Sequence, residues 1–161
     1  MIIVVMGVAG SGKTTVGELL SKQLAWKFID GDQLHPPENI KKMRARQPLT
    51  EIDRVHWLDR IETRLKAIST SSAAAVLAAS VLRRSHRDRI RSGASTVQFV
   101  YLKGDFEQIK ARLEQRSDHF FGWDLLASQF EILEEPESAI VVDISLEPVE
   151  IVRKIRNNLA V

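Results

Sequence analysis

The sequence contains no cysteine, and this absence excludes two kinds of structure. Without thiols, the chain forms neither a disulfide nor a zinc site built on thiolates. The absence of cysteine also fits a reducing compartment such as the cytoplasm. Stability must therefore come from an apolar core, and 161 residues, read as one domain over 1–161, are enough to build one.

Long hydrophobic runs are also missing. The apolar run at 1–6 is too short for the apolar region of a signal peptide and fits a first β-strand. No stretch approaches the roughly 20 apolar residues that a helix needs to cross a bilayer. We expect a cytoplasmic protein without a membrane partner.

Neither sign of charge is in large excess, since 23 basic residues stand against 21 acidic ones and the formal net charge is +2. The pI is nevertheless about 9.0. With one tyrosine and no cysteine, almost no group titrates between neutrality and the lysine range, so a small excess of base raises the pI. The basic segment 83–91 lacks interleaved aromatic residues on which bases would stack. We expect no nucleic-acid partner.

The first chemical signal is the segment 7–15, GVAGSGKTT, which lies between the apolar run and a helical pattern. It matches the phosphate-binding pattern G-x-x-x-x-G-K-[ST] in the strand–loop–helix context that the pattern requires. Its glycines let successive N–H groups turn toward one anion, at which the dipole of the following helix also points. The predicted nucleotide-binding residues here are Gly7, Val8, Ala9, Gly10, Ser11, Gly12, Lys13, Thr14 and Thr15. The sequence thus predicts binding of a nucleoside triphosphate.

Apolar strand-like runs alternate with longer helical patterns along the chain. Continuous apolar strands separated by helices are typical of a parallel sheet that helices cover on both faces. In such sheets, ligands bind beyond the carboxyl ends of the strands. The predicted strands are 2–6, 27–30, 73–79, 97–102 and 139–143, and the predicted helices are 13–25, 37–46, 51–69, 82–91, 105–115, 124–134 and 147–159.

Two aspartates flank a glycine directly after the second predicted strand, in Asp30-Gly31-Asp32. In a phosphotransferase, one carboxylate would orient the acceptor hydroxyl and take its proton, while the other would act near Mg²⁺ and its waters. The same residues also suit an Asx-type turn that leads to a helix capped before Pro36. Both interpretations stay open on the residues alone.

Charged residues further along also allow two interpretations. Thr50 is expected to cap the helix that begins at 51, and Asp53 and Arg54 in its first turn fit surface charges as well as a site. The cations of 83–89 follow a strand end, which suits an anionic substrate but equally a solvated helix face.

Arg112 and Arg116 lie four residues apart and therefore on one helix face. They precede a polar and aromatic segment at 117–123. In small P-loop kinases, such a segment forms a lid that closes over ATP, brings arginines to the transferring phosphoryl group and excludes water. An ordinary helical hairpin is the alternative.

Several segments occur in an order and at distances that resemble the small, thermoresistant type of gluconate kinase. They are GVAGSGKTT, FIDGDQLHPPENIKKM, PLTEIDRVHWL, ASVLRRSHRD, YLKGD, HFF and LLASQFEILEEP. The resemblance covers nearly the whole chain. It implies a P-loop kinase fold similar to that of shikimate and nucleoside monophosphate kinases. This is a three-layer α/β/α domain with a five-stranded parallel sheet, order 2-3-1-4-5, and a small lid at about 116–124.

The resemblance also implies an activity: phosphorylation of D-gluconate at its 6-hydroxyl by a homodimer that uses ATP and Mg²⁺. Lys13 would bind phosphate, and Asp32 would position the 6-hydroxyl and accept its proton. Thr14 and Asp30 would lie at the magnesium ion. Arg116 would reach the phosphates and complete the catalytic set.

Further binding roles follow from the same resemblance. Arg112 would lie over the adenine, opposite a loop near Pro148. The residues expected around gluconate are Asp32, His35, Arg54, Arg83, Arg87, His119 and Gln129.

The segment after the third strand departs from the family pattern C-S-A-L-K-R-x-Y-R-D. Its first, third, fifth and eighth positions are Ala79, Val81, Arg83 and His86. Arg83 in place of lysine keeps the charge but presents a planar fork. If Arg83 holds the carboxylate of gluconate, affinity or substrate choice would differ from that of the family.

Other functions are compatible with parts of the sequence. Adenylylsulfate kinases and shikimate kinases share the P-loop and the acidic turn, but neither accounts for HPPENIKKM, HFF and SQF together. The glycine triplet expected for shikimate recognition is absent. A P-loop protein that binds ATP without transferring phosphate is the alternative from another class, against which the Asp30–Asp32 pair and the arginines argue.

Overall fold

The strands form one parallel sheet in the order β2-β3-β1-β4-β5, as the resemblance implies. The computed structural model describes residues 1–94, 96–115 and 122–161. The central strand β1 pairs with β3 and β4, while β2 and β5 form the two edges. The strands are β1 (Ile2–Met6), β2 (Lys27–Asp30), β3 (Ala75–Ala78), β4 (Val97–Lys103) and β5 (Ile140–Asp143).

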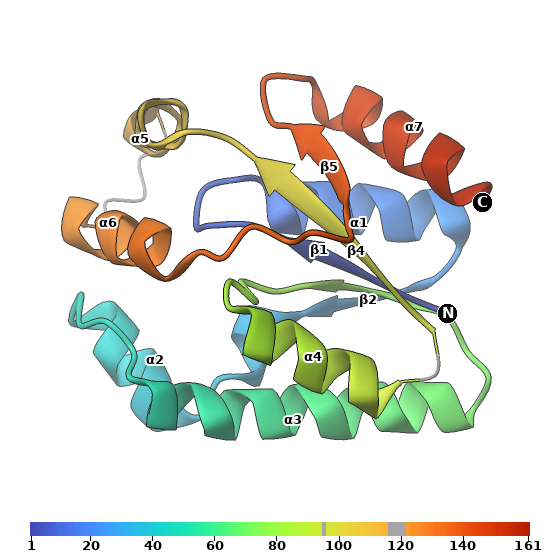
Figure 1. Ribbon diagram of the computed structural model, residues 1–161, viewed down its shortest axis with the longest axis horizontal. Coiled ribbons are helices and arrows are strands. Elements are labelled where there is room, and N and C mark those ends of the chain that lie inside the picture. Colours follow the sequence, from blue (N-terminus) through green and yellow to red (C-terminus); the bar gives the residue numbers. More distant parts are fainter. Residues whose placement is uncertain (95, 116–121) are drawn as a thin grey trace.

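Helices cover both faces of the sheet, which makes three layers (Figure 1). One face is covered by α1 (Lys13–Leu24) and α7 (Pro148–Leu159), and the other by α3 (Glu51–Thr70) and α4 (Arg84–Gly93). The remaining helices gather beyond the carboxyl ends of the strands, on the left of Figure 1: α2 (Pro37–Arg44), α5 (Phe106–Gln115) and α6 (Trp123–Ile132). A short 3₁₀ helix, η1 (Gly31–Leu34), directly follows β2.

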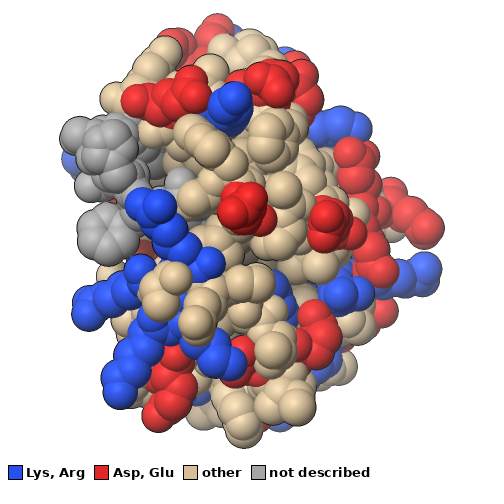
Figure 2. Space-filling view, turned by 90° about the vertical axis from the view of Figure 1, so that its left-hand side faces the viewer, with Lys and Arg blue, Asp and Glu red and all other residues tan. Residues whose placement is uncertain are grey.

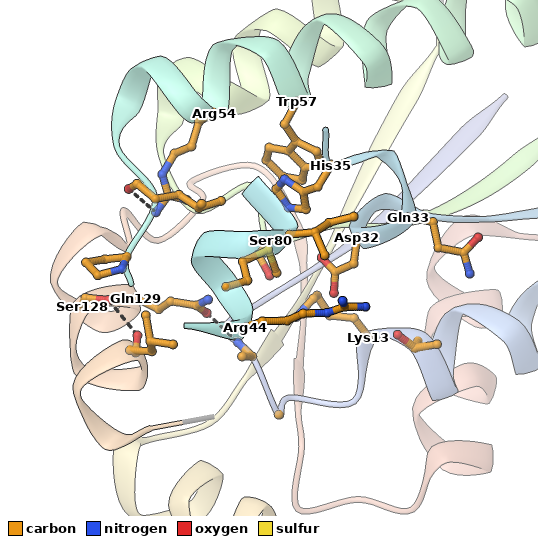
Figure 3. Close-up of a pocket in the computed structure, with 18 of the residues that line it drawn as sticks. Lys13, Asp32, Gln33, His35, Arg44, Arg54, Trp57, Ser80, Ser128 and Gln129 are labelled. Atoms are coloured by element: carbon orange, nitrogen blue, oxygen red, sulfur yellow. Dashed lines mark hydrogen bonds between the residues drawn. The ribbon is translucent and has the colours of Figure 1, made fainter. Parts of the chain in front are cut away.

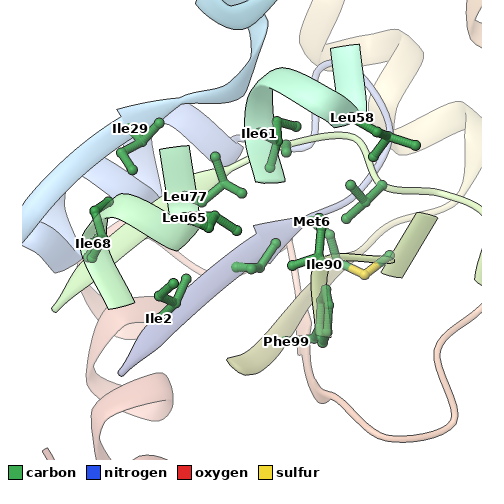
Figure 4. Packing of buried hydrophobic residues seen from close by; sticks show 14 of the residues in the cluster. Ile2, Met6, Ile29, Leu58, Ile61, Leu65, Ile68, Leu77, Ile90 and Phe99 are labelled. Atoms are coloured by element: carbon green, nitrogen blue, oxygen red, sulfur yellow. The ribbon is translucent and has the colours of Figure 1, made fainter. Parts of the chain in front are cut away.

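The core has two halves because β1 is buried on both faces. Alternate side chains of a strand point to opposite faces of a sheet. Ile2, Val4 and Met6 therefore join one cluster, and Ile3 and Val5 join the other. The first cluster includes Leu58, Ile61 and Leu65 of α3 and Ile90 of α4 (Figure 4), together with Trp57 of α3. The second cluster includes Val16, Leu20, Ile151 and Ile155.

The predicted cap of α3 is confirmed. The Asp53 N–H donates to Thr50 Oγ1 at 3.2 Å, and the Thr50 N–H donates to Asp53 Oδ2 at 2.8 Å. This reciprocal pair satisfies two N–H groups that a helix start leaves without partners. Asp53 also forms an ion pair with Lys42 of α2 at 2.7 Å, so the cap joins the two helices.

The helix after β3 was expected from residue 82, but α4 begins at Arg84. Val81 and Leu82 are buried, and their carbonyl oxygens accept hydrogen bonds from the Arg87 guanidinium at 3.2 and 2.8 Å. The chain therefore stays non-helical for two residues longer than the polar pattern indicates. No helix within the described ranges combines the length and the apolar character that crossing a bilayer would require.

Candidate active site

The predicted phosphate-binding loop connects β1 to α1. Gly10 and Gly12 have φ angles of +79° and +96°, in the left-handed region that side chains with a Cβ rarely adopt. Gly12 is the N-terminal cap residue of α1, and no side chain in the described part of the chain caps this helix start. The first N–H groups of α1 are therefore available to an anion, which the helix dipole also favours.

Lys13 is the buried cation of this loop, with 9% of its surface exposed. Its ammonium group donates a hydrogen bond to the Val8 carbonyl oxygen at 2.9 Å. Burial lowers the pKa of Lys13, while the nearby carboxylates of Asp32 and Asp30 act in the opposite direction. One hydrogen bond does not replace the hydration that the buried ammonium has lost. A bound polyphosphate would supply further hydrogen bonds and opposite charge, and so stabilise the charged form of Lys13.

The two aspartates take different places. Asp30 accepts a hydrogen bond on Oδ1 from the Asp32 N–H at 3.0 Å, which closes the expected Asx-type turn, and burial raises the pKa of Asp30. Asp32 is exposed and lines the same cavity as Lys13. The turn interpretation and the functional one are therefore compatible, because the turn aims Asp32 at the phosphate-binding loop.

A tryptophan fixes this turn from the other side. The Trp57 Nε1–H donates to the Gly31 carbonyl oxygen at 2.8 Å. A Cβ at Gly31 would lie 2.6 Å from the Ala78 carbonyl oxygen, so only glycine fits between the turn and β3. Trp57 also stacks on His35, with ring centroids 4.8 Å apart and planes inclined by 10°.

His35 is buried and is held in one orientation. Its Nδ1 lies 3.1 Å from the amide nitrogen of Asn39, which also donates to the Asp53 carbonyl oxygen at 2.9 Å. Since the amide nitrogen is a donor, Nδ1 accepts and the proton of the neutral ring resides on Nε2. Burial, together with the nearby Arg54 cation, lowers the pKa of His35 to about 4. At neutral pH, His35 is a neutral hydrogen-bond donor in the wall of the cavity.

This low pKa predicts a pH dependence of stability. Between its ordinary pKa of 6.5 and about 4, the unfolded chain binds a proton at residue 35 that the folded chain does not. The contribution is complete above pH 6.5, and about 3 kcal/mol is lost as the pH falls to 4. His35→Gln should remove this part of the slope in urea unfolding measured from pH 7.5 to 4. His56→Gln, on the exposed side of α3, serves as the control, and an unchanged slope in His35→Gln would contradict the assignment.

The site is a cavity of about 600 Å³ between the phosphate-binding loop, η1, α2, α3 and α6 (Figure 3). Four predicted substrate residues line it: Asp32, His35, Arg54 and Gln129. Arg54 lies on the side of the cavity away from Lys13. Its guanidinium donates to the Leu49 carbonyl oxygen at 3.4 Å, and its buried Nε has no hydrogen-bond partner within the described ranges. Arg54 therefore keeps unused donor capacity beside the cavity.

Gln129 joins α6 to the phosphate-binding loop. Its Oε1 accepts a hydrogen bond from the Ala9 N–H at 2.7 Å. This bond fixes the orientation of the side-chain amide, so that the NH₂ group is the end left to bind another partner. The sequence predicted Gln129 near the acceptor, and the structure places it in the cavity wall and against the nucleotide loop.

Arg83 and Arg87 do not line this cavity. Arg83 Nε forms an ion pair with Glu51 at 3.0 Å, and the same carboxylate lies 3.2 Å from His86. Arg87 is buried against the carbonyl oxygens of the β3–α4 connection. Both have protein partners, and their contact with the substrate stays a prediction.

Arg112 lies near Gly12, the last residue of the phosphate-binding loop before α1, whereas Gln129 binds the loop at Ala9. The Arg112 guanidinium donates to the Ile144 carbonyl oxygen and passes close to Gly12, where an added Cβ would lie 3.8 Å from its Nη1. Pro148 is the first residue of α7, shortly after Ile144. An adenine bound here would lie between α5 and the β5–α7 connection, and this placement stays a prediction. Arg116 and His119 lie outside the described residues.

Three residues at the site had no role predicted from the sequence: Asn39, Trp57 and Arg44. Trp57 follows Arg54 by three residues within α3, so helical spacing was the available signal for Trp57. His35 lies before α2, so no helical spacing linked Asn39 to it. The sequence also did not show which partner each side chain contacts across the turn.

The fold and the site define a small-molecule kinase of the P-loop class, in which a phosphate-binding loop faces an acidic turn across one cavity. A shikimate kinase family model matches residues 9–157 of the chain. The chain is 41% identical to the thermoresistant gluconokinase of Escherichia coli (strain K12) over 153 residues, which cover 92% of this chain and 87% of the relative. The chain belongs to the gluconokinase family, within the shikimate kinase group, and it is an ATP-dependent enzyme.

Solved structures agree with this assignment. A gluconokinase from Sinorhizobium meliloti 1021 superimposes with a TM-score of 0.90 at 42% identity, covering 98% of this chain and 90% of its own. A sugar kinase from Janibacter sp. HTCC2649 superimposes with a TM-score of 0.92 at 36% identity, covering 99% and 94%. The family resemblance and the fold expected from the sequence are confirmed.

Proposed function

We propose that the protein transfers the γ-phosphoryl group of ATP to the 6-hydroxyl of D-gluconate, giving 6-phospho-D-gluconate and ADP. The observation that carries the proposal is a single cavity in which the buried ammonium of Lys13 faces the carboxylate of Asp32. The gluconokinase relatives support gluconate as the acceptor. They disfavour an adenylylsulfate or shikimate acceptor and a non-catalytic ATP-binding role.

ATP would lie with its phosphates in the loop between β1 and α1. The free N–H groups at the start of α1 and the Lys13 ammonium would bind the β- and γ-phosphates. The adenine would lie between Arg112 and the connection that leads to Pro148. This placement directs the γ-phosphate toward the cavity that Asp32 lines.

Gluconate would lie across the cavity with its two ends recognised by opposite charges. The carboxylate would bind Arg54, whose guanidinium keeps unused donors, and the 6-hydroxyl would lie at Asp32. The hydroxyl oxygen attacks phosphorus while the bond from the γ-phosphorus to ADP breaks, and Asp32 takes the hydroxyl proton. His35 Nε2–H and the amide of Gln129 would bind the hydroxyls between. Arg83, Arg87 and His119 remain further candidates, and Arg83 would have to leave Glu51 to take part.

The residues present fit a magnesium ion. Thr14 is exposed at the start of α1 and lines the cavity, and the carboxylates of Asp30 and Asp32 lie near Lys13 at the same edge. The described residues hold no group of three or more His, Asp or Glu side chains suited to a metal. Mg²⁺ usually keeps waters and substrate phosphates as ligands, so Thr14 with Asp30 in an outer position is sufficient. The ion would neutralise charge on the phosphates.

Three properties complete the proposal. The segment at about 116–124 would close over ATP as a lid and bring Arg116 to the phosphates. The enzyme would act in the cytoplasm and as a homodimer. Ile52 and Val55, exposed by 73% and 45% one turn apart on α3, offer apolar surface for such an interface. Light scattering at micromolar concentration would measure the oligomeric state.

A coupled assay for ADP release tests the function. The acceptors are gluconate, other aldonates, shikimate, adenylylsulfate and glucose, with and without Mg²⁺. We expect turnover with gluconate and Mg²⁺, and none with glucose, because glucose lacks the carboxylate proposed to bind Arg54. Transfer of label from [γ-³²P]ATP to gluconate would confirm the product. No turnover with any acceptor would favour the non-catalytic role instead.

A further inference from the structure

Arg44 is a further cation in the cavity, beside Lys13 and Arg54. It is the last residue of α2, is exposed, and lines the same cavity as Lys13, Gly10 and Gly12. None of the hydrogen bonds or ion pairs found within residues 1–94, 96–115 and 122–161 engages its guanidinium. Its charge is therefore available to a ligand.

Two neighbouring cations differ from Arg44 in that each has an acidic partner among the described residues. Lys42, on the same helix, lies 2.7 Å from Asp53, and Arg54 lies 3.6 Å from Glu51 and donates to the Leu49 carbonyl oxygen. Lysine and arginine side chains gather in the lower part of the face shown in Figure 2, at the height at which α2 lies in Figure 1. Arg44 differs from Lys41 of the same helix turn in that its side chain lines the cavity.

The backbone that carries Arg44 is held firmly. Asn39 is 1% exposed and binds both His35 and the Asp53 carbonyl oxygen, and the Lys42–Asp53 ion pair adds a second link from α2 to α3. The helix is therefore fixed to the wall that also positions His35. A free side chain on a fixed helix is a geometry suited to reaching a bound substrate.

The direction of the side chain indicates which substrate group it meets. In Figure 3, Arg44 extends from α2 across the cavity toward the side on which Lys13 lies, whereas Arg54 lies at the other side near Trp57 and His35. A guanidinium group presents a planar fork of donors that matches phosphate oxygens. Its charge is most effective where negative charge develops during phosphoryl transfer.

We propose that Arg44 binds the phosphoryl group during its transfer, as a further catalytic cation supplied from the acceptor side of the cavity. Lys13 holds the phosphoryl group from the nucleotide side, and Arg44 holds the same oxygens from α2 while the bond to ADP breaks and the bond to the acceptor oxygen forms. This inference rests on the proposed function, because it requires phosphoryl transfer within this cavity.

The test compares Arg44→Ala with Lys41→Ala, which removes the same charge from the same exposed helix turn without altering the cavity wall. Loss of one charge-assisted contact to the transferring group should lower kcat about 10- to 100-fold in Arg44→Ala. Lys41→Ala should stay within about twofold of wild type, the range of screened surface charges. Arg44→Lys should be intermediate, and added guanidinium chloride, below denaturing concentration, should restore part of the rate of Arg44→Ala alone.

Two results would overturn the inference while leaving the proposed function intact. One is a kcat of Arg44→Ala equal to that of Lys41→Ala. The other is an unchanged kcat with a raised KM for gluconate, which would assign Arg44 to the carboxylate. If wild-type enzyme in the same series released no ADP with gluconate, the proposed function itself would fail. Circular dichroism of each variant checks that the fold is kept.

Discussion

Replacement of Lys13 by methionine should lower kcat by about 10³-fold, in the range of groups that clamp a transferring phosphoryl. Lys13 is buried at the start of α1, where its ammonium is expected to bind the β- and γ-phosphates. Methionine keeps the length and the apolar part of the side chain but removes the charge. Turnover would be measured by coupled ADP release at saturating ATP and gluconate.

Thermal unfolding separates this loss from misfolding. Burial penalises the charged form of Lys13 and lowers its pKa, so removal of the charge relieves a cost in the folded protein. The midpoint of unfolding of Lys13→Met should stay at or above that of wild type. Lys22→Met, at the exposed end of the same helix, is the matched control and should keep full activity. Nearly normal turnover of Lys13→Met would refute the role given to this ammonium.

The second large effect is expected for Asp32→Asn, which should lower kcat by about 10²- to 10⁴-fold, the usual range for loss of a general base. Asparagine keeps the size of the side chain and the backbone turn, whose hydrogen bond uses the Asp32 N–H and the Asp30 carboxylate. ATP affinity, measured by calorimetry with a non-hydrolysable analogue, should change little because the carboxylate acts on the acceptor.

Two comparisons sharpen the result for Asp32. Glu38→Gln removes one exposed carboxylate from the first turn of α2 and should leave kcat unchanged. If Asp32→Asn lost affinity for ATP and Mg²⁺ but kept its kcat, the side chain would belong to the metal site rather than to the acceptor.

The parts of the fold that the sequence predicted are those set by local rules. Apolar runs bounded by polar turns located the strands to within two residues, and Thr50 identified the start of α3 through a cap that needs only residues 50 and 53. The order of the strands came from the family resemblance, because periodicity does not show which strands become neighbours. The phosphate-binding loop was predictable because its chemistry lies in nine consecutive residues.

The acceptor half of the site was harder to predict because its residues are positioned by contacts distant in sequence. Trp57 reaches back 26 residues to Gly31, and Asn39 reaches forward 14 residues to Asp53. The cations after β3 were also harder to interpret, because local charge left a substrate site and a solvated helix face equally open. The resemblance placed Arg87 near the substrate, which stays a prediction, and its guanidinium binds the carbonyl oxygens of the β3–α4 connection.

The hydrogen bond between Gln129 and Ala9 has a consequence for how the two ligands influence each other. The Gln129 side chain comes from α6 and accepts a hydrogen bond from the Ala9 N–H of the phosphate-binding loop, 120 residues away in sequence. A nucleotide phosphate that took the Ala9 N–H would force the Gln129 carboxamide to reorient in the wall of the cavity proposed to bind the acceptor. We therefore expect binding of one ligand to change the affinity for the other through this one side chain.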